Sequence, residues 1–543
     1  MRRKGSPAWL VMVALLALVV AACGGDDAED TTTTTQAATT TIADGGETTT
    51  TTEPEPAEEE SDTVAIGMGN MPPSGMPYLG AGSPGQYVWS NVFDALTRIG
   101  PDGAPEPWLA ESWSTADDNV TWTFNLRDGV TFSNGEPLDA AAVEATFGTV
   151  LSEDGRATYS ANINNYGFID SVTAVDDVTV EIVTATPNVL LPSAISIAYI
   201  LPPAYFAEAG AEGFAAAPIG SGPYEVVSWG GDEIVLQARA DSWRGQPDIE
   251  TIQYLNLPDP AARVQALQSG QIDVAQSPSP DQAQSLVDAG FEVFSASRGQ
   301  VLAMALITVD GGPLADVRVR QALNYAVDKE AIQDALTGGF APTAGLYPSP
   351  GVNGFDPSRF VYPYDPDMAR ELLAEAGFPD GFDIEAEMTL GSFPADAEIF
   401  EAMAGYLADV GVNVTITQID FAGEWLPNFL GTDGADWAGD AFNYSWGTAP
   451  LFDGIRPFNF YQCNWGNPWY CDEEAMPLIE AVNTTFDVDE RNALLEQLLD
   501  HTAENPPSVM LSENFELWAH TADLSGFEVF AFNKPFDSVS SSG

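Results

Sequence analysis

The sequence predicts an α/β protein that folds into more than one lobe. Its 543 residues exceed what one hydrophobic core ordinarily supports, so two or more lobes are expected. Helical and strand patterns also alternate: apolar residues of 260–267 recur at helical spacing, Gly270 ends that run, and a strand-like stretch at 272–275 follows. Such alternation is typical of α/β architectures.

The elements follow in order from their apolar spacing. Apolar residues alternate with polar ones at 120–126, which predicts a half-buried strand, and turns at 128–129 and 134–135 come next. Further strands are predicted at 222–227 and 233–236, paired antiparallel, and at 414–417 and 509–511. Helices are predicted at 138–150, 322–336 and 368–376, and from Asp487 onward.

The first 22 residues have the form of an export signal. Arg2, Arg3 and Lys4 precede an apolar run at 8–20, which is shorter than the roughly 20 residues that a membrane-spanning helix needs. Residues 20–23 (VAAC) resemble the bacterial lipobox, which implies cleavage before Cys23 and lipidation of that cysteine. An ordinary secretory signal with an incidental cysteine is the alternative. Residues 23–62 then form the lipidated cysteine and a Thr- and Glu-rich tether that we expect to be disordered.

The charge and the few metal-binding side chains exclude several classes of function. The formal net charge of −62 excludes nucleic acid as a partner and argues against adhesion to anionic lipid headgroups. Of the three cysteines, Cys463 and Cys471 remain after lipidation, and we predict a disulfide between them in an exported protein; two free thiols are the alternative. With only His501 and His520, no metal site and no cofactor are expected.

Several ordered stretches together are similar to the family 5 extracellular solute-binding proteins of ABC importers, which include dipeptide, oligopeptide and nickel binders. The stretches are NVFDAL at 91–96, PWLAESW at 107–113, WTFNLRDGV at 122–130, FSNG at 132–135, GSGPY at 220–224, and PLADVRVRQAL at 313–323 followed by AVDK at 326–329. Taken alone, these side chains are expected in cores and turns, and Arg318 and Arg320 are expected to orient a helix through surface contacts.

The resemblance implies a two-lobed, type II periplasmic-binding-protein-like fold. Lobe I would comprise residues 63–300, with an inserted subdomain at about 101–205, and the chain would return to it at 508–543. Lobe II would be the continuous stretch 301–507. The chain would cross between the lobes near 298–303 and 506–511, and these two crossings would act as a hinge that closes on a small ligand.

In relatives, the ligand lies between a loop before the first marker helix and a loop containing a tryptophan. Here the corresponding loops would be 81–87 and 443–448. The candidate ligand-binding residues are Gly82, Ser83, Gln86, Tyr87, Tyr444, Trp446, Gly447 and Thr448. For the aromatic members, core packing is the alternative. Peptide binders usually carry an aspartate three residues after this tryptophan, where this chain has Ala449, so a peptide, an oligosaccharide and a chelated metal all remain open as ligands.

The expected function is the capture of a small solute and its delivery to an ABC permease and ATPase, by a monomer held by its lipid on the outer face of the cytoplasmic membrane. A secreted hydrolase is the first alternative. However, 80 acidic residues make close carboxylate pairs unavoidable, and the chain has no Gly-x-Ser-x-Gly elbow, His-Glu-x-x-His motif or P-loop. No catalytic residue is therefore predicted. A lipid-anchored surface receptor that senses a ligand without transporting it is the second alternative.

Overall fold

The structure of the protein, a computed structural model, describes residues 63–79, 83–159, 166–341, 343–359, 362–391, 395–530 and 536–542. The predicted signal peptide at 1–22, Cys23, the tether to residue 62 and Gly82 lie outside the described residues. Among the helices that are described, none is long and apolar enough to cross a membrane.

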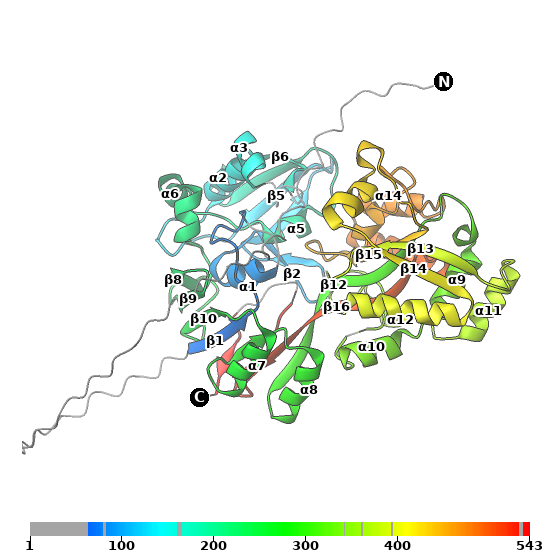
Figure 1. The fold of residues 1–543 in the computed structure, drawn as a ribbon. Helices are drawn as coiled ribbons and strands as arrows, with labels where there is room; N and C mark the ends of the chain where they lie inside the picture. The colour runs from blue at the N-terminus through cyan, green and yellow to red at the C-terminus, as the bar shows by residue number, and fades with distance from the viewer. Residues whose placement is uncertain are drawn as a thin grey trace, which may run out of the picture. The chain divides into compact units, whose positions relative to one another are not determined.

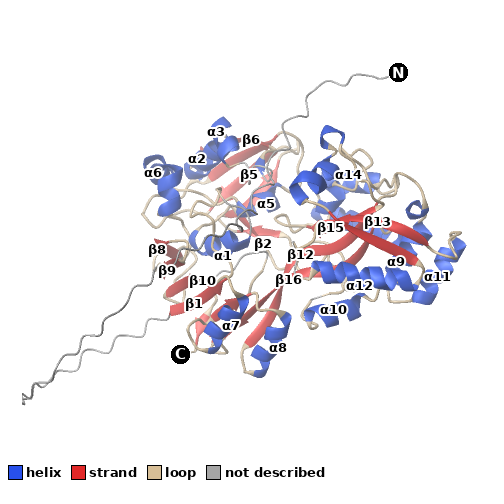
Figure 2. Ribbon diagram, viewed as in Figure 1, coloured by secondary structure: helices blue, strands red, loops and turns tan. Residues whose placement is uncertain are grey.

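A mixed sheet of ten strands runs through the described chain (Figures 1 and 2). Its order is β14 (Val412–Gln418), β13 (Phe382–Met388), β15 (Ala441–Gly447), β12 (Glu292–Leu306), β16 (Ser508–His520), β11 (Val274–Gln276), β1 (Thr63–Met68), β10 (Thr251–Asn256), β9 (Glu233–Ala238) and β8 (Tyr224–Trp229). The strands β1, β10 and β11 pair parallel, as do β13, β14 and β15, whereas β12 pairs antiparallel with both neighbours.

The two longest strands, β12 and β16, connect the halves of this sheet. They pair antiparallel from Glu292 opposite His520 to Ala305 opposite Ser508, and in Figure 1 they lie side by side in green and red. At one end, Ala296 and Trp518 pack into a hydrophobic cluster with β1, β9 and β10. At the other end the same strands enter two different clusters. The chain therefore passes twice between the two halves.

The hydrophobic clusters define two lobes. Lobe I is built around the cluster that contains Ile66, Trp89 and Tyr254. Lobe II has a cluster on each face of its sheet, because alternate residues of β12 point to opposite sides: Leu302, Met304 and Leu306 enter one cluster, and Val301, Ala303 and Ala305 enter the other. The predicted two-lobed α/β fold is confirmed.

The remaining strands form smaller sheets, and helices pack against both the large sheet and the four-stranded one. In lobe I, a four-stranded antiparallel sheet consists of β4 (Ala110–Thr115), β5 (Thr121–Leu126), β7 (Thr179–Thr184) and β6 (Ile169–Asp176), and two-stranded pairs are formed by β2 (Thr97–Ile99) with β3 (Pro105–Pro107) and β17 (Leu524–Ser525) with β18 (Ser540–Ser541). The helices are α1 (Ser83–Val92), α2 (Ala140–Leu151), α3 (Glu153–Thr158), α5 (Leu191–Ala194), α6 (Pro203–Ala216), α7 (Pro260–Gln268), α8 (Pro280–Asp288), α9 (Val317–Tyr325), α10 (Lys329–Thr337), α11 (Pro366–Glu375), α12 (Asp396–Asp409), α13 (Leu426–Leu430), α14 (Met476–Thr484) and α15 (Val488–Glu504).

Aspartate caps begin many of these helices. The side chains of Asp259, Asp328, Asp365 and Asp487 each accept a hydrogen bond from a backbone N–H in the first turn of α7, α10, α11 and α15. Such caps satisfy N–H groups that have no partner within the helix, and a negative charge there also complements the helix dipole. Part of the acidic excess therefore specifies where helices start.

The expectation that Arg320 makes surface contacts is wrong. Its side chain is buried in lobe II and donates to the carbonyl oxygens of Pro506 at 2.9 Å, Leu314 at 3.1 Å and Ala315 at 3.0 Å. It thereby ties the start of α9 to the segment that leads into β16. Arg318, by contrast, is half exposed and pairs with Asp316.

Candidate functional site

The lobe I part of the predicted site lies on helix α1. The expectation of a loop from Ala81 to Tyr87 is wrong from Ser83 onward, because α1 begins there. Pro84 fits this position, since a proline in the first turn lacks only an N–H that would have no helical partner. The side chain of Ser83, like Gly82, is outside the described residues.

Gln86 and Tyr87 hold α1 against different parts of lobe I. The hydroxyl of Tyr199 donates to Gln86 Oε1 at 2.7 Å. The Tyr87 ring is buried and meets Trp518 of β16 edge to face, with 5.2 Å between ring centroids, and its hydroxyl donates to Glu516 Oε2. Gln86 keeps a partly exposed side chain, whereas Tyr87 is a core residue that carries one polar contact.

Glu516 joins α1 to both crossing strands. Its Oε1 accepts hydrogen bonds from Gln276 Nε2 at 2.9 Å and Ser277 Oγ at 2.8 Å, and it pairs with Arg298 of β12 at 3.2 Å. Burial, reinforced by the charge of Glu516, holds the pKa of the Tyr87 phenol well above its usual range. The phenol therefore remains a hydrogen-bond donor to the carboxylate at physiological pH.

The lobe II part of the predicted site is a strand, and the expectation of a loop at 443–448 is wrong. Residues Ala441–Gly447 form β15, which lies between β13 and β12, and Trp446 stands opposite Val301. Only Thr448 lies beyond the strand. The backbone of β15 pairs with β12 along the whole strand, but with β13 only at Ala441 and Phe442, so from Asn443 onward the ladder with β13 does not occupy the second edge of β15.

Trp446 and Tyr444 pack among other aromatic rings. The Trp446 side chain is fully buried and its Nε1 donates to Ser508 Oγ at 3.2 Å. Its ring lies 4.6 Å from that of Tyr461, 4.8 Å from Tyr347 and 5.2 Å from Phe458, measured between centroids. Trp446 is therefore packed as a core residue, which was the alternative to a ligand contact.

Gly447 and Thr448 bind the end of β15 to the first crossing strand. Thr448 donates to the carbonyl oxygen of Gly299 twice, from its backbone N at 2.9 Å and from Oγ1 at 2.8 Å. Gly299 has a φ of +62°, and a Cβ there would lie 2.7 Å from Thr448 Oγ1. A glycine is therefore needed where the crossing strand meets the end of β15.

Arg456 is a cation close to this junction that has no acidic partner among the described residues. Its Nη1 donates to the Gly447 carbonyl oxygen at 2.7 Å, and within the described chain that is the one hydrogen bond of its side chain. Burial lowers the pKa of the guanidinium, and the titratable groups near it are the phenols of Tyr444 and Tyr347, which burial keeps neutral by raising their pKa. The Tyr444 hydroxyl also makes no hydrogen bond to a described residue. The guanidinium thus keeps donors, besides the one bonded to Gly447, that no described residue accepts, and the Tyr444 hydroxyl lies near it.

Glu513 is a buried carboxyl group on the same face of the sheet as Trp446. Val301 stands opposite Trp446 on one side and Glu513 on the other, so the three side chains share one face. Glu513 is 2% exposed and accepts hydrogen bonds from Ser297 Oγ and from Thr343 Oγ1 at 2.7 Å. Burial raises its pKa to about 7, although these hydroxyls oppose the shift.

The lobes also touch away from the crossing strands. A cluster joins Ile99 of lobe I to Val352 and Phe452 of lobe II, and Trp122 meets Phe486 with 5.8 Å between centroids. Gly103 approaches so closely that a Cβ there would lie 2.3 Å from the backbone N of Asn353. Phe452 thus lies where the lobes meet, and Arg456 follows it closely in the sequence.

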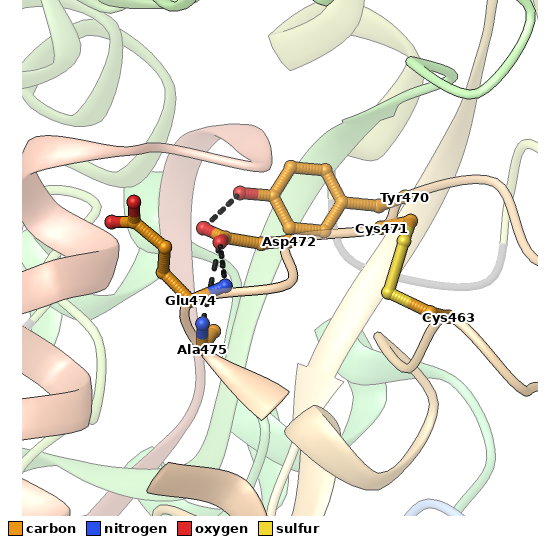
Figure 3. Close-up of a disulfide and its surroundings, with 6 residues drawn as sticks. All are labelled: Cys463, Tyr470, Cys471, Asp472, Glu474 and Ala475. Atoms are coloured by element: carbon orange, nitrogen blue, oxygen red, sulfur yellow. Dashed lines mark hydrogen bonds between the residues drawn. A yellow bond between two sulfur atoms is a disulfide. The ribbon is translucent and has the colours of Figure 1, made fainter. Parts of the chain in front are cut away.

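Cys463 and Cys471 form a disulfide with 4.5 Å between their Cα atoms, as the sequence predicts (Figure 3). Beside it, Asp472 Oδ1 accepts from the backbone N of Glu474 at 3.0 Å and of Ala475 at 3.2 Å, and Tyr470 donates to Oδ2 at 3.3 Å. These bonds fix the chain where it leaves the disulfide. No three acidic, histidine or cysteine side chains of the described residues gather as metal ligands.

The structure brings the predicted site residues together in two groups. Tyr444, Trp446, Gly447 and Thr448 lie at β12, whereas Tyr87 contacts β16 through Glu516 and Gln86 contacts Tyr199. Within the described chain, no hydrogen bond or ring contact links the groups directly. Sequence reasoning missed Arg456, Glu513 and Glu516. A signal for the last two existed, because acidic residues inside the apolar strand pattern of 508–520 are expected to be buried and bonded.

Two lobes on one sheet, joined by two crossing strands, define the class of two-lobed binding proteins. The sequence profile of the bacterial extracellular solute-binding proteins, family 5 Middle, matches residues 104–468, and the chain belongs to this family.

Several known proteins are similar to this chain in sequence or in fold. The chain is 29% identical over 474 residues to the glutathione-binding protein GsiB of Pectobacterium atrosepticum, covering 83% of this chain and 89% of that protein. It is 27% identical to GsiB of Escherichia coli over 470 residues, with the same coverage. Among solved structures, HbpA2 of Haemophilus parasuis superposes with a TM-score of 0.78 at 24% identity, covering 89% of this chain and all of that one.

Proposed function

We propose that this protein binds a small peptide-like acid between its lobes and delivers it to an ABC permease and its ATPase, without altering it chemically. The observation that carries this proposal is the pair of crossing strands, since two passes of the chain allow the lobes to hinge about one line. Membership of the solute-binding family supports the transport role. A ligand that touches both lobes favours the closed arrangement by its extra contacts there.

We propose the lobe boundaries of the sequence prediction: 63–300 and 508–543 for lobe I, with an inserted subdomain at about 101–205, and 301–507 for lobe II. The hydrophobic clusters support the limit at residue 300, whereas Val509 and Leu511 keep the first residues of 508–543 with lobe II. Ala296 packs with lobe I and Leu302 with lobe II along β12, and Leu511 packs with lobe II and Trp518 with lobe I along β16. The four-stranded sheet lies within the inserted range.

We propose that the ligand lies between α1 with its preceding residues and the junction of β15 with β12. The residues concerned remain Gly82, Ser83, Gln86, Tyr87, Tyr444, Trp446, Gly447 and Thr448, to which Arg456 is added. Arg456 is suited to a ligand carboxylate because it is partly buried and lacks an acidic partner. A carboxylate there would form charge-assisted hydrogen bonds and offset the cost of desolvating the guanidinium.

The relatives support a peptide-like acid over an oligosaccharide. Two of them are named glutathione-binding proteins, and a dipeptide-binding protein from Pseudoalteromonas was solved in complex with Met-Leu. Because Ala449 stands where peptide binders carry an aspartate, we propose recognition through the carboxylate of the ligand and not through its ammonium group.

The test is a calorimetric titration of the purified protein with reduced glutathione, di- and tripeptides, oligosaccharides and metal chelates. We expect saturable one-to-one binding of at least one carboxylate-bearing peptide, with the ligand recovered unchanged. Arg456→Gln should weaken that binding about 10- to 100-fold, because a hydrogen bond to a charged group is lost. Arg370→Gln, at an arginine with a 49% exposed side chain, is the control and should bind as the parent does.

Three results would each refute part of this proposal. Turnover of the peptide would replace transport by the hydrolase alternative. Binding of an oligosaccharide and of no peptide would show that the ligand is not a peptide-like acid. Undiminished affinity in Arg456→Gln would leave the solute-binding function intact and exclude Arg456 from the site.

We further propose that the mature protein is a monomer anchored through lipidated Cys23 on the outer face of the cytoplasmic membrane. The lipobox-like residues 20–23 support this, and two or more acyl chains on one cysteine anchor a protein stably. Expressed in a bacterial host, the parent should fractionate with membranes and Cys23→Ser should be soluble or retained with its signal peptide. Equal membrane association of both forms would contradict the lipid anchor.

A further inference from the structure

A cavity lies in lobe II beside the second crossing strand. It offers about 60 Å³ to the centres of water-sized molecules and is lined by residues of 324–362 and 499–510. A single water needs roughly 10 to 15 Å³ of such space, so this cavity has room for a small organic molecule. All its lining residues belong to lobe II, and none is among the residues proposed to bind the transported solute.

One wall of the cavity carries a buried lysine without an acidic partner. Lys329 is 5% exposed, and within the described chain its Nζ makes one hydrogen bond, to Asn324 Oδ1 at 3.3 Å. Its burial lowers the pKa of the ammonium group to about 7. Its other recorded contact is the Tyr362 ring, 5.8 Å from Nζ to the ring centroid. A buried ammonium with only these neutral partners is costly, and an anion beside it would offset that cost.

A second cationic side chain lines the same cavity. The Arg359 side chain is 5% exposed, and its Nη1 contacts Asp500 and the carbonyl oxygen of Glu496. Its Nε is buried and has no hydrogen-bond partner in the described chain. Among the described residues, Asp500 is the one acidic group paired with these two cations, and its side chain is 71% exposed. The chain has a net charge of −62, yet this cavity carries two cations and little negative charge, which favours an anionic ligand.

The other walls are largely apolar, with Leu346, Leu499, Ala503, Pro507 and Met510 among the lining residues. An oxyanion with three or four charged oxygens would leave several of them without donors there. A monoanion with an apolar body matches both the cationic donors and the walls. We propose that this cavity binds a small monocarboxylate of about two to four carbons between Lys329 and Arg359, as a second site separate from the transported ligand.

Occupancy of this site would stabilise lobe II without requiring the lobes to close. The cavity includes Ser508 and Met510 at the lobe II end of β16, together with the segment at 345–347 that lies against that strand. A bound carboxylate would therefore add contacts within lobe II alone. The site is independent of the proposed transport function, and the test below requires no knowledge of the transported solute.

The experiment is differential scanning calorimetry of the purified protein with acetate, propionate or butyrate, against sodium chloride and phosphate at equal ionic strength. We expect at least one carboxylate to raise the melting temperature saturably, by about 3 °C at a hundredfold excess over its dissociation constant. Isothermal titration should give one site per chain. Absence of a saturable response to every carboxylate, or an equal response to phosphate, would overturn the proposal.

Two variants test which residues hold the carboxylate. Lys329→Met keeps an unbranched apolar side chain that is one atom shorter and removes the charge, so it should abolish the carboxylate response. Arg359→Gln should weaken binding at least tenfold and serves if the first variant fails to fold. Arg370→Gln, outside the cavity in the same lobe, should respond as the parent does. A full response in both Lys329→Met and Arg359→Gln would overturn the assignment of the site to this cavity.

Discussion

Replacing Glu513 by glutamine should change how the stability of the protein depends on pH. The carboxyl pKa is about 7 in the fold, against an ordinary value of 4.5. The native state therefore holds a proton between these values that the unfolded chain releases, and the free energy of unfolding falls as pH rises through this window. At about 1.4 kcal/mol per pKa unit, the parent loses about 2.5 kcal/mol between pH 5 and pH 8 from this group.

Glutamine keeps the size of the side chain and does not titrate, so Glu513→Gln should escape that loss. Over roughly 480 folded residues the entropy of unfolding is about 1 kcal/mol/K, and the expected gain corresponds to about 2.5 °C. Calorimetry gives the melting temperature of the variant minus that of the parent at each pH. This difference should be larger at pH 8 than at pH 5 by that amount. The exposed Glu480→Gln controls for loss of one charge. Parallel pH curves for the parent and Glu513→Gln would refute the buried, protonated carboxyl.

Three further changes test contacts of the site and its surroundings. Cys463→Ser opens a loop of eight residues and should cost about 2.5 kcal/mol of unfolding free energy; an unchanged urea midpoint would show that the disulfide is not formed in solution. Trp446→Ala should cost about 3 to 5 kcal/mol, which urea unfolding measures, and near-parental stability would contradict its core position. Tyr87→Phe removes the hydrogen bond to Glu516 and should cost about 1 to 2 kcal/mol, whereas equal melting temperatures by calorimetry would show that the bond contributes nothing.

The fold could be predicted from local pattern wherever a strand has one buried face. Residues 120–126 alternate in polarity, and β5 has alternating burial there. The strand β15 could not be found in this way, because six of its seven residues are buried and a strand covered on both faces shows no period of two. Its asparagine, serine and glycine then suggested a loop. Asp487 shows the opposite case, since its capping of α15 could be predicted from Asp487 and Glu490 alone.

The site was predictable only as far as segments, because its contacts join distant parts of the chain. Glu513 and Ser297 are 216 residues apart, and Tyr87 and Glu516 are 429 apart. A local pattern can indicate that an acidic residue in an apolar strand is buried, but it cannot identify the hydroxyl that donates to it. For Arg456, the informative feature is the lack of an acidic neighbour among the described residues, which only coordinates reveal.

Three of the stretches that identify the family, at 91–96, 107–113 and 220–224, meet at one buried carboxylate and not at the candidate ligand site. Asp94 is fully buried and accepts from Trp108 Nε1 at 2.8 Å, Ser221 Oγ at 2.8 Å and Trp243 Nε1 at 2.9 Å. Arg244 pairs with it at 3.2 Å and also pairs with Asp537. These residues come from four separate segments and the C-terminal return of the chain. Because a buried charge is tolerated only when it is paired and fully bonded, each segment constrains the others. Such stretches therefore specify the packing of lobe I, while the identity of the ligand depends on other residues, such as Arg456.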